Sequence, residues 1–212
     1  MLTYTTVAVG MLENNIYILK DEATGALALV DCGSFTKSVR EAVAAAGGDL
    51  RYILLTHGHF DHILGVPRAK EAYPAAQVAV GEQDAPYLRG EMDTLPGRPS
   101  IHKSAVEPDI ILRGGDVIRL GKSVLQVIFT PGHTPGGQCF LAAADGLLFT
   151  GDTLFCEEVG RADLPGGDWE TLVASIQRLY DLPGDPTVLP GHGPVSALEH
   201  ERGNNPYVRR GL

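Results

Sequence analysis

The feature that most constrains this chain is an apolar run that ends in the motif THGHFDH, residues 56–62. Extended backbone points alternate side chains to the same side, so His57 and His59 are placed to converge on one ion. Asp61 continues this spacing and His62 breaks it, which predicts that the chain turns here and directs these two residues toward a second ion. A polar loop with scattered histidines is the weaker interpretation, because three of the seven histidines lie within this motif.

Three later segments repeat the same arrangement of an apolar run, a glycine and a ligand-type side chain. They are TPGH, TGD and LPGH, and they end at His133, Asp152 and His192. A glycine lets the backbone turn sharply at the end of a strand and approach a site closely. Each segment alone is typical of an ordinary turn, but three repetitions that each deliver a histidine or aspartate predict a shared site.

Seven side chains are therefore candidate metal ligands, in two groups that share one carboxylate. The first group is His57, His59 and His133, the second is Asp61, His62 and His192, and the shared bridging residue is Asp152. Imidazole and carboxylate ligands together suit zinc, iron or manganese. We expect two divalent transition metal ions, zinc before iron or manganese. A hydroxide that bridges the ions is the expected nucleophile, with Asp61 and Asp152 as the catalytic carboxylates.

Short apolar runs separated by turns predict an α/β chain rich in strands. Strands are expected over 3–9, 15–19 and 26–30, and a helix over Lys37–Ala46 with Ser34 as its N-cap. A second clear helix is predicted over Trp169–Tyr180. The order of strands, helix, strand and helix occurs once in each half, which predicts a single domain over 1–212 with helices outside two β-rich halves. Residues 90–108 are predicted to form a long irregular loop.

The ligand pattern resembles that of the metallo-beta-lactamase superfamily. HxHxDH followed by a separate His, Asp and His is the motif set that carries this resemblance, which runs from about Val9 to the C-terminus. The resemblance implies a four-layer αββα sandwich with the metals at one edge between the two sheets. The candidate ligands predicted above follow strands, and this agrees with a metal site at that edge.

Two further segments resemble the glyoxalase II-like branch of this superfamily. They are GRADLPGGD, residues 160–168, and the ending from Glu201-Arg202 to Asn205-Pro206-Tyr207. Only 20 residues (212 minus 192) follow the last ligand, so we expect the short single-domain form and leave the thiol carrier open.

We expect two more residues, Asp31 and Arg161, to have roles near this site. The resemblance implies that Asp31 supports the ligands, and a simple turn aspartate is an equally good interpretation. Arg161 is predicted to hold a substrate carboxylate through two parallel hydrogen bonds. An internal ion pair with Asp163 is the alternative interpretation of Arg161.

The resemblance implies hydrolysis of an acyl-thiol ester, such as a 2-hydroxyacyl-glutathione-like conjugate. One alternative is a persulfide dioxygenase, which holds one iron with two His and one Asp; His57, His133 and Asp152 are the matching residues. Another hydrolase of the same fold is a second alternative, and a non-catalytic metal-binding module is a third.

The charge and composition of the chain restrict the partners and the cellular location that we expect. The net charge of -9 and the pI of about 5.2 argue against nucleic acid as a partner, because phosphate binding needs a basic surface. Without a basic leader or an apolar run of about 20 residues, we expect a cytoplasmic protein with no membrane partner. The three cysteines form no CxxC pair, so free thiols are expected. The expected partner is a small-molecule substrate, and the oligomeric state is left open.

Overall fold

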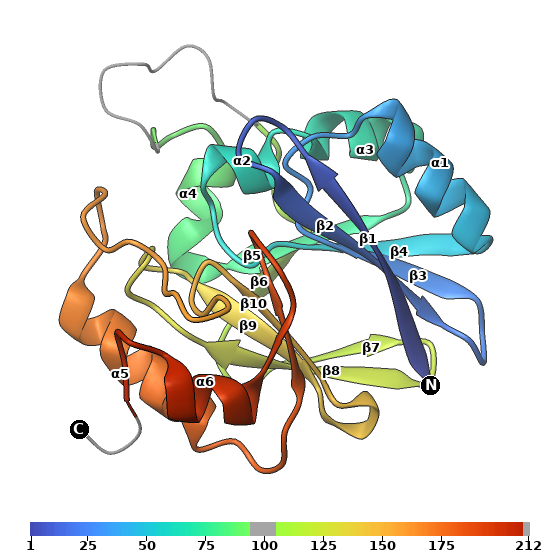
Figure 1. Cartoon of the computed structure of the whole chain (residues 1–212). Coiled ribbons are helices and arrows are strands. Elements are labelled where there is room, and N and C mark those ends of the chain that lie inside the picture. The colour runs from blue at the N-terminus through green and yellow to red at the C-terminus, as the bar shows by residue number, and fades with distance from the viewer. Residues whose placement is uncertain (94–104, 210–212) are drawn as a thin grey trace.

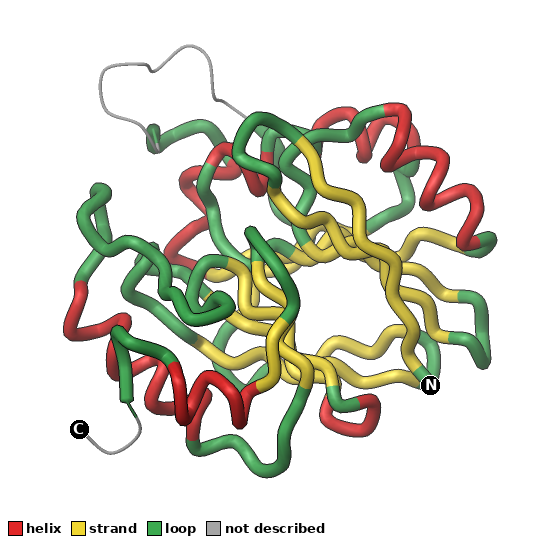
Figure 2. The backbone as a smooth tube through the Cα atoms, viewed as in Figure 1, coloured by secondary structure: helices red, strands yellow, loops and turns green. Residues whose placement is uncertain are grey.

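The computed structural model describes residues 1–93 and 105–209, and it consists of two six-stranded sheets packed face to face (Figures 1 and 2). The first sheet has the order β1 (Leu2–Val9), β2 (Asn14–Asp21), β3 (Ala26–Val30), β4 (Asp49–Leu54), β5 (Gln77–Gly81) and β6 (Ile110–Leu112). The second sheet has the order β12 (Ser196–Ala197), β11 (Thr187–Pro190), β10 (Leu147–Gly151), β9 (Gln138–Ala142), β8 (Ser123–Phe129) and β7 (Val117–Leu120).

Helices cover the outer face of each sheet, as Figure 1 shows. The first sheet carries α1 (Lys37–Ala46), α2 (Phe60–Ile63), α3 (Val66–Ala72), the 3-10 turn η1 (Glu82–Asp84) and α4 (Ala85–Leu88). The second sheet carries α5 (Trp169–Tyr180) and α6 (Leu198–Asn204), and a short turn, η2 (Ala143–Asp145), joins β9 to β10. The four-layer αββα sandwich expected from the sequence is confirmed.

Strand periodicity divides the buried residues among the layers. In β2, Ile16 and Ile18 join the cluster beneath α1 and α3, whereas Tyr17 and Leu19 join the cluster between the two sheets. Successive strand residues point to opposite faces, so a strand covered on both faces is apolar throughout. Burial of each large apolar side chain stabilises the folded state by about 1.5–3 kcal/mol, so the layered core is the main source of stability.

The strongest sequence patterns match the observed helices. Helices α1 and α5 have the predicted bounds. The predicted N-cap at Ser34 is wrong: the helix begins at Lys37, so Thr36 is the residue next to its first turn, and the Thr36 hydroxyl accepts from the Val39 amide at 3.4 Å. Residues 94–104 of the predicted long loop lie outside the described residues.

The last strand and helix, β12 and α6, were not expected from the sequence. They span two and seven residues, too few for a periodic pattern to be recognised. Among the helices of residues 1–93 and 105–209, none combines the length and the apolar character needed to cross a membrane.

Strand direction brings several strand ends to one edge of the sandwich. Strands β3, β4 and β5 run parallel in the first sheet, and β10 and β11 run parallel in the second. Parallel neighbours have their carboxyl ends at the same edge. The turns after these strands therefore meet at one place, and we call this place the ligand edge.

Candidate metal centre

All seven candidate ligands lie at the ligand edge. His57 and His59 follow β4, and Asp61 and His62 lie in the short helix α2. The remaining three residues, His133, Asp152 and His192, follow β8, β10 and β11. Their metal binding remains a prediction, whereas their convergence is a property of the fold.

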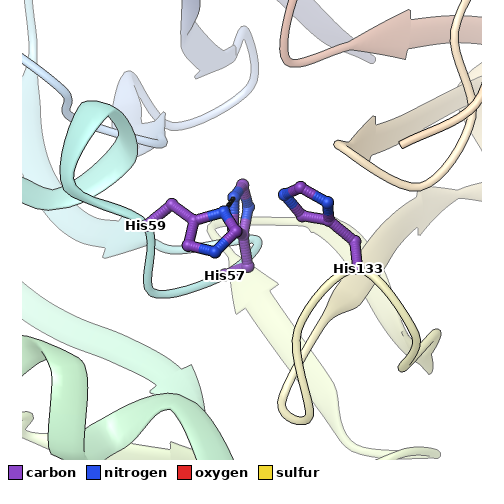
Figure 3. A group of neighbouring side chains, drawn as sticks. All are labelled: His57, His59 and His133. Carbon is purple, nitrogen blue, oxygen red and sulfur yellow. Dashed lines mark hydrogen bonds between the residues drawn. The ribbon is translucent and has the colours of Figure 1, made fainter. Parts of the chain in front are cut away.

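The first ligand group consists of three buried histidines, each 2–5% exposed: His57, His59 and His133. Figure 3 shows their imidazoles turned toward one another from two separate turns. His57 Nε2 lies 3.1 Å from His59 Nδ1, and the three ligand atoms lie within 4.8 Å of one another. Three nitrogens that converge this closely are spaced to share one ion.

The second ligand group combines one carboxylate with two imidazoles. His192 Nε2 lies 3.3 Å from both His62 Nε2 and Asp61 Oδ2. The His62 side chain is fully buried, and the side chains of Asp61 and His192 are 15% and 24% exposed. This group therefore lies closer to solvent than the first.

The carboxylate of Asp152 lies between the two groups. Its Oδ1 is 3.4 Å from His62 Nε2, and its Oδ2 is 3.5 Å from both His133 Nε2 and His192 Nε2. One carboxylate thus faces nitrogens of both groups, which is the arrangement that a bridging ligand requires.

Hydrogen bonds hold four of the five rings by the nitrogen that faces away from the centre. These outer contacts are His57 Nδ1 with Thr56 Oγ1 at 3.1 Å, His62 Nδ1 with Asp31 Oδ2 at 2.8 Å, His133 Nδ1 with the Arg161 carbonyl at 2.7 Å, and His192 Nδ1 with the Leu12 carbonyl at 2.7 Å. A hydrogen bond of this kind fixes the orientation of a metal-binding imidazole. Each of these rings therefore presents its Nε2 to the centre.

The electrostatics of the two groups differ. Burial, assisted by the neighbouring histidines, lowers the pKa of His57 and holds the pKa of His59 at about 3. Burial also opposes charge on His62, but the carboxylates of Asp152 and Asp31 raise its pKa overall. His57 and His59 are thus neutral at pH 7, as metal-ligand nitrogens must be.

Asp152 is ionised in this setting. Burial alone would raise its pKa, but His62 and the other nearby imidazoles lower it below the ordinary value. A buried carboxylate among imidazoles supplies the negative charge that a divalent cation requires.

Two buried atoms at the centre support the fit to metal ions. Within residues 1–93 and 105–209, His133 Nε2 and Asp152 Oδ1 have no hydrogen-bond partner, although buried polar atoms are almost always paired. Both atoms face the other candidate ligands. Imidazole nitrogen and carboxylate oxygen are ordinary ligands of zinc and iron. The donor set therefore fits one divalent ion per group, with Asp152 shared.

The glycines before Asp152 and His192 have a structural reason. Gly151 adopts a φ of +50°, and a β-carbon on it would lie 2.4 Å from Thr56 Oγ1. A β-carbon on Gly191 would lie 2.3 Å from Asp152 Oδ1. The turns that deliver Asp152 and His192 pack so closely that they exclude any side chain at these positions.

Two depressions adjoin the centre, and both are bordered by His133, Asp152, Arg161 and His192. One, of ≈ 530 Å³, is lined by Leu12, Phe60 and Leu164. The other, of ≈ 360 Å³, is lined by Phe155, Cys156, Glu158, Val159 and Pro194. The centre therefore lies at the junction of two recesses with different linings.

Arg161 lies at this junction but is already paired. Its guanidinium donates two hydrogen bonds to the Asp163 carboxylate, at 2.6 and 2.8 Å. The pair is exposed, with 60% of the Arg161 side chain accessible. The structure thus contains the ion pair that was the alternative interpretation of this residue, and the substrate contact remains a prediction.

Sequence reasoning missed three residues near the site. Leu12 contributes its carbonyl, Asn14 Nδ2 lies 3.1 Å from His62 Nδ1, and Asp84 lies buried behind the first group. Only Asp84 had a sequence cue, since an apolar run and a glycine precede it, as they precede the later ligands.

Comparisons with known proteins agree with this geometry. A profile of the metallo-beta-lactamase superfamily matches residues 9–192. A probable metallo-hydrolase of Streptococcus pyogenes is 34% identical over 92% of this chain and 85% of its own length. The hydroxyacylglutathione hydrolase GloC of Haemophilus influenzae is 30% identical over 95% of this chain and 96% of its own length.

Solved structures show the same fold over nearly the whole chain. The crystal structure of BLEG-1 B3 metallo-beta-lactamase has a TM-score of 0.88 and 28% identity, covering 97% of this chain and 99% of that one. The crystal structure of TTHA1623 in a di-iron-bound form has a TM-score of 0.85 and 34% identity, covering 96% of this chain and all of that one (100%).

Proposed function

Because the chain belongs to the metallo-beta-lactamase superfamily, we propose that it is a glyoxalase II-like thioesterase. Its substrate would be a small acyl-thiol ester of the 2-hydroxyacyl-glutathione kind. The observation that carries the proposal is the position of Asp152, between two ligand groups and at the junction of two recesses. The relative named hydroxyacylglutathione hydrolase supports the choice of ester.

The two recesses suit a substrate with two unlike arms. A thioester has an acyl arm and a thiol arm that meet at the carbonyl carbon. Apart from the candidate ligands and Arg161, the first recess is lined by apolar residues, Leu12, Phe60 and Leu164, whereas the other includes Cys156 and Glu158 beside its apolar residues. A carbonyl held at the junction would lie beside Asp152, with one arm in each recess.

Two divalent ions, when bound, would supply a water of lowered pKa and a Lewis acid for the carbonyl oxygen. The chain's own residues hold that centre in place. The first histidine group and the second mixed group would each hold one ion, and Asp152 would be shared between them. Asp61, which lies in the wall of the apolar recess, completes the second group from the substrate side.

A protein nucleophile is not needed for this reaction, and two of the cysteines are unsuited to the role. Burial raises the pKa of the Cys139 thiol to about 11 and raises that of Cys32 further. A thiol is nucleophilic only as the thiolate, so both residues are packing residues. The third, Cys156, lies in a recess wall.

A parallel assay tests the proposal. The purified protein, with metals per chain measured, is given a panel of acyl-thiol esters, a β-lactam, and a persulfide with oxygen uptake recorded. Ester hydrolysis with two metals per chain is expected. Persulfide-dependent oxygen uptake with one iron per chain would establish the dioxygenase alternative instead. β-Lactam hydrolysis alone would assign the other hydrolase class, and tight metal binding without turnover would leave only a binding module.

A further inference from the structure

Asp84 is a fully buried carboxylate that lies beside the first ligand group but is not part of it. It ends η1, directly after β5, and none of its side chain is exposed. Burying a carboxylate is unfavourable unless hydrogen bonds compensate the lost hydration. The hydrogen bonds of Asp84 therefore indicate which groups stabilise this buried carboxylate.

Three donors surround this carboxylate, and they come from two loops. The Gly58 amide donates to Oδ2 at 2.8 Å, and Gly58 lies between two histidines of the first group. The Thr134 hydroxyl donates to Oδ2 and the Gly136 amide to Oδ1, both at 2.7 Å. Thr134 directly follows the third histidine of that group. One side chain thus ties together the two loops that carry all three nitrogens.

The backbones of these loops pack closely against one another. A β-carbon on Gly136 would lie 2.4 Å from the Asp84 amide nitrogen, and one on Gly81 would lie 2.2 Å from the Gly136 carbonyl oxygen. On the other side, a β-carbon on Gly58 would lie 2.7 Å from the ring of Tyr87. The three loops are in direct contact, and the carboxylate of Asp84 fills the space between them.

Asp31 has a similar position beside the second group. It is 1% exposed, and it accepts from the Thr56 amide and from His62 Nδ1, both at 2.8 Å. The two carboxylates differ in what they hold. Asp31 contacts a ligand ring, whereas Asp84 accepts hydrogen bonds from non-ligand residues of the loops that carry the ligands.

We propose that Asp84 is the positioning residue of the first ligand group. It sets the separation between the loop of His57 and His59 and the loop of His133, and so sets the affinity of that group for a divalent ion. The inference rests on the proposed metal centre but does not depend on which ester the protein hydrolyses.

Zinc binding in two backgrounds tests this role. H192A disables the second group and isolates the first, whereas H59A disables the first and isolates the second. D84N is added to each background, and zinc affinity is measured by competition with a chelator. In H192A we expect D84N to weaken binding about 10–100-fold, the usual effect of losing a hydrogen bond that supports a metal site. In H59A the affinity should change less than about twofold, within the range of ordinary surface substitutions.

Two controls make the test specific. E82Q alters a carboxylate two residues away, but that carboxylate is exposed and pairs with Arg113, so zinc affinity should not change in either background. D31N should weaken zinc binding more in H59A than in H192A, because Asp31 contacts His62.

A milder variant keeps the test decisive if D84N fails to fold. T134V removes one donor, leaves the carboxylate, and should weaken zinc binding in H192A by a smaller factor. Circular dichroism of the metal-free variants checks their folding. Equal loss of affinity in both backgrounds, or no loss in H192A, would overturn the proposal. Because the assay contains no ester, a failure of the thioesterase proposal would not affect it.

Discussion

Strand β2 has a buried polar residue at each end, and the two ends differ in how these residues are paired. At the end far from the metal centre, Asp21 accepts hydrogen bonds from the hydroxyls of Thr24 and Ser123, at 2.6 and 2.8 Å, and from the Lys122 amide at 3.1 Å. At the ligand edge, Asn14 Oδ1 has no hydrogen-bond partner in the part of the chain that the structure describes. The buried polar side chain at one end of this strand is thus hydrogen-bonded, whereas the side-chain oxygen at the other end is unpaired.

The contrast extends over the whole sandwich. Within the described residues, the buried side-chain atoms without a hydrogen-bond partner are all at the ligand edge: Asn14 Oδ1, His133 Nε2, Gln138 Oε1 and Asp152 Oδ1. Each such atom costs about 1–3 kcal/mol. Paired buried groups at the far edge therefore stabilise the fold. The unpaired atoms at the ligand edge lower its stability, and bound cations would complete the site there.

The largest effect should come from Asp152, the shared residue of the ligand edge. Asp152→Ala should reduce ester hydrolysis at least about 10²-fold, because it removes both a ligand and the positioning of the two groups. Steady-state kinetics and metal analysis of the same preparation measure the change. Near-normal turnover would show that Asp152 does not bridge the groups.

A single ligand of the first group should control one metal. His59→Ala should lower the metal content from two ions per chain to one. Elemental analysis after metal loading measures this change. His200→Ala is the matched control, since this exposed histidine pairs with Glu157 away from the centre. A parent protein that stays at one ion when metal is in excess would rule out the two-ion arrangement.

The far edge should show the opposite behaviour. Asp21→Asn should lower the melting temperature by a few degrees, because it weakens a satisfied buried network, and it should leave metal content and turnover unchanged. Thermal unfolding of the metal-free and metal-loaded proteins measures both effects. A loss of metal in this variant would contradict the separation of the two edges.

Acid should remove the contribution of Asp21 in a defined range. Hydrogen bonds, that from Thr24 first, lower its pKa from 3.8 to about 2. A carboxyl with a lowered pKa stabilises the fold above its unfolded value and loses that contribution as the pH falls through the folded value. The difference in unfolding free energy between parent and Asp21→Asn should therefore shrink from pH 4 to pH 2. A constant difference across this range would show that the charge of Asp21 contributes nothing.

The smallest effect is expected at the junction of the recesses. Arg161→Lys should raise KM a few-fold with little change in kcat, because lysine cannot form two parallel hydrogen bonds to a carboxylate. The melting temperature should hardly change, since an exposed ion pair contributes about 0–1 kcal/mol. A lower melting temperature with poorer metal loading would instead assign Arg161 a structural role. If KM, stability and metal content were all unchanged, Arg161 would be a solvated surface residue.

The sequence by itself determined the features that depend on local spacing. Alternation along extended chain placed His57 and His59 together, and helical periodicity defined α1 and α5. The glycines before Asp152 and His192 predicted close turns, and the structure supplies the steric reason for both. These are consequences of backbone geometry over a few residues.

Only the tertiary structure decided which residues support the ligands. Asp84 is 26 residues from Gly58 and 52 from Gly136, and Leu12 is 180 residues from His192. The contacts of Asp84 with Gly136 and of Leu12 with His192 join loops of different sheets, and all three contacts use backbone atoms of one partner. No residue type or spacing encodes them, because they exist only once the two sheets have packed and brought their strand ends to one edge.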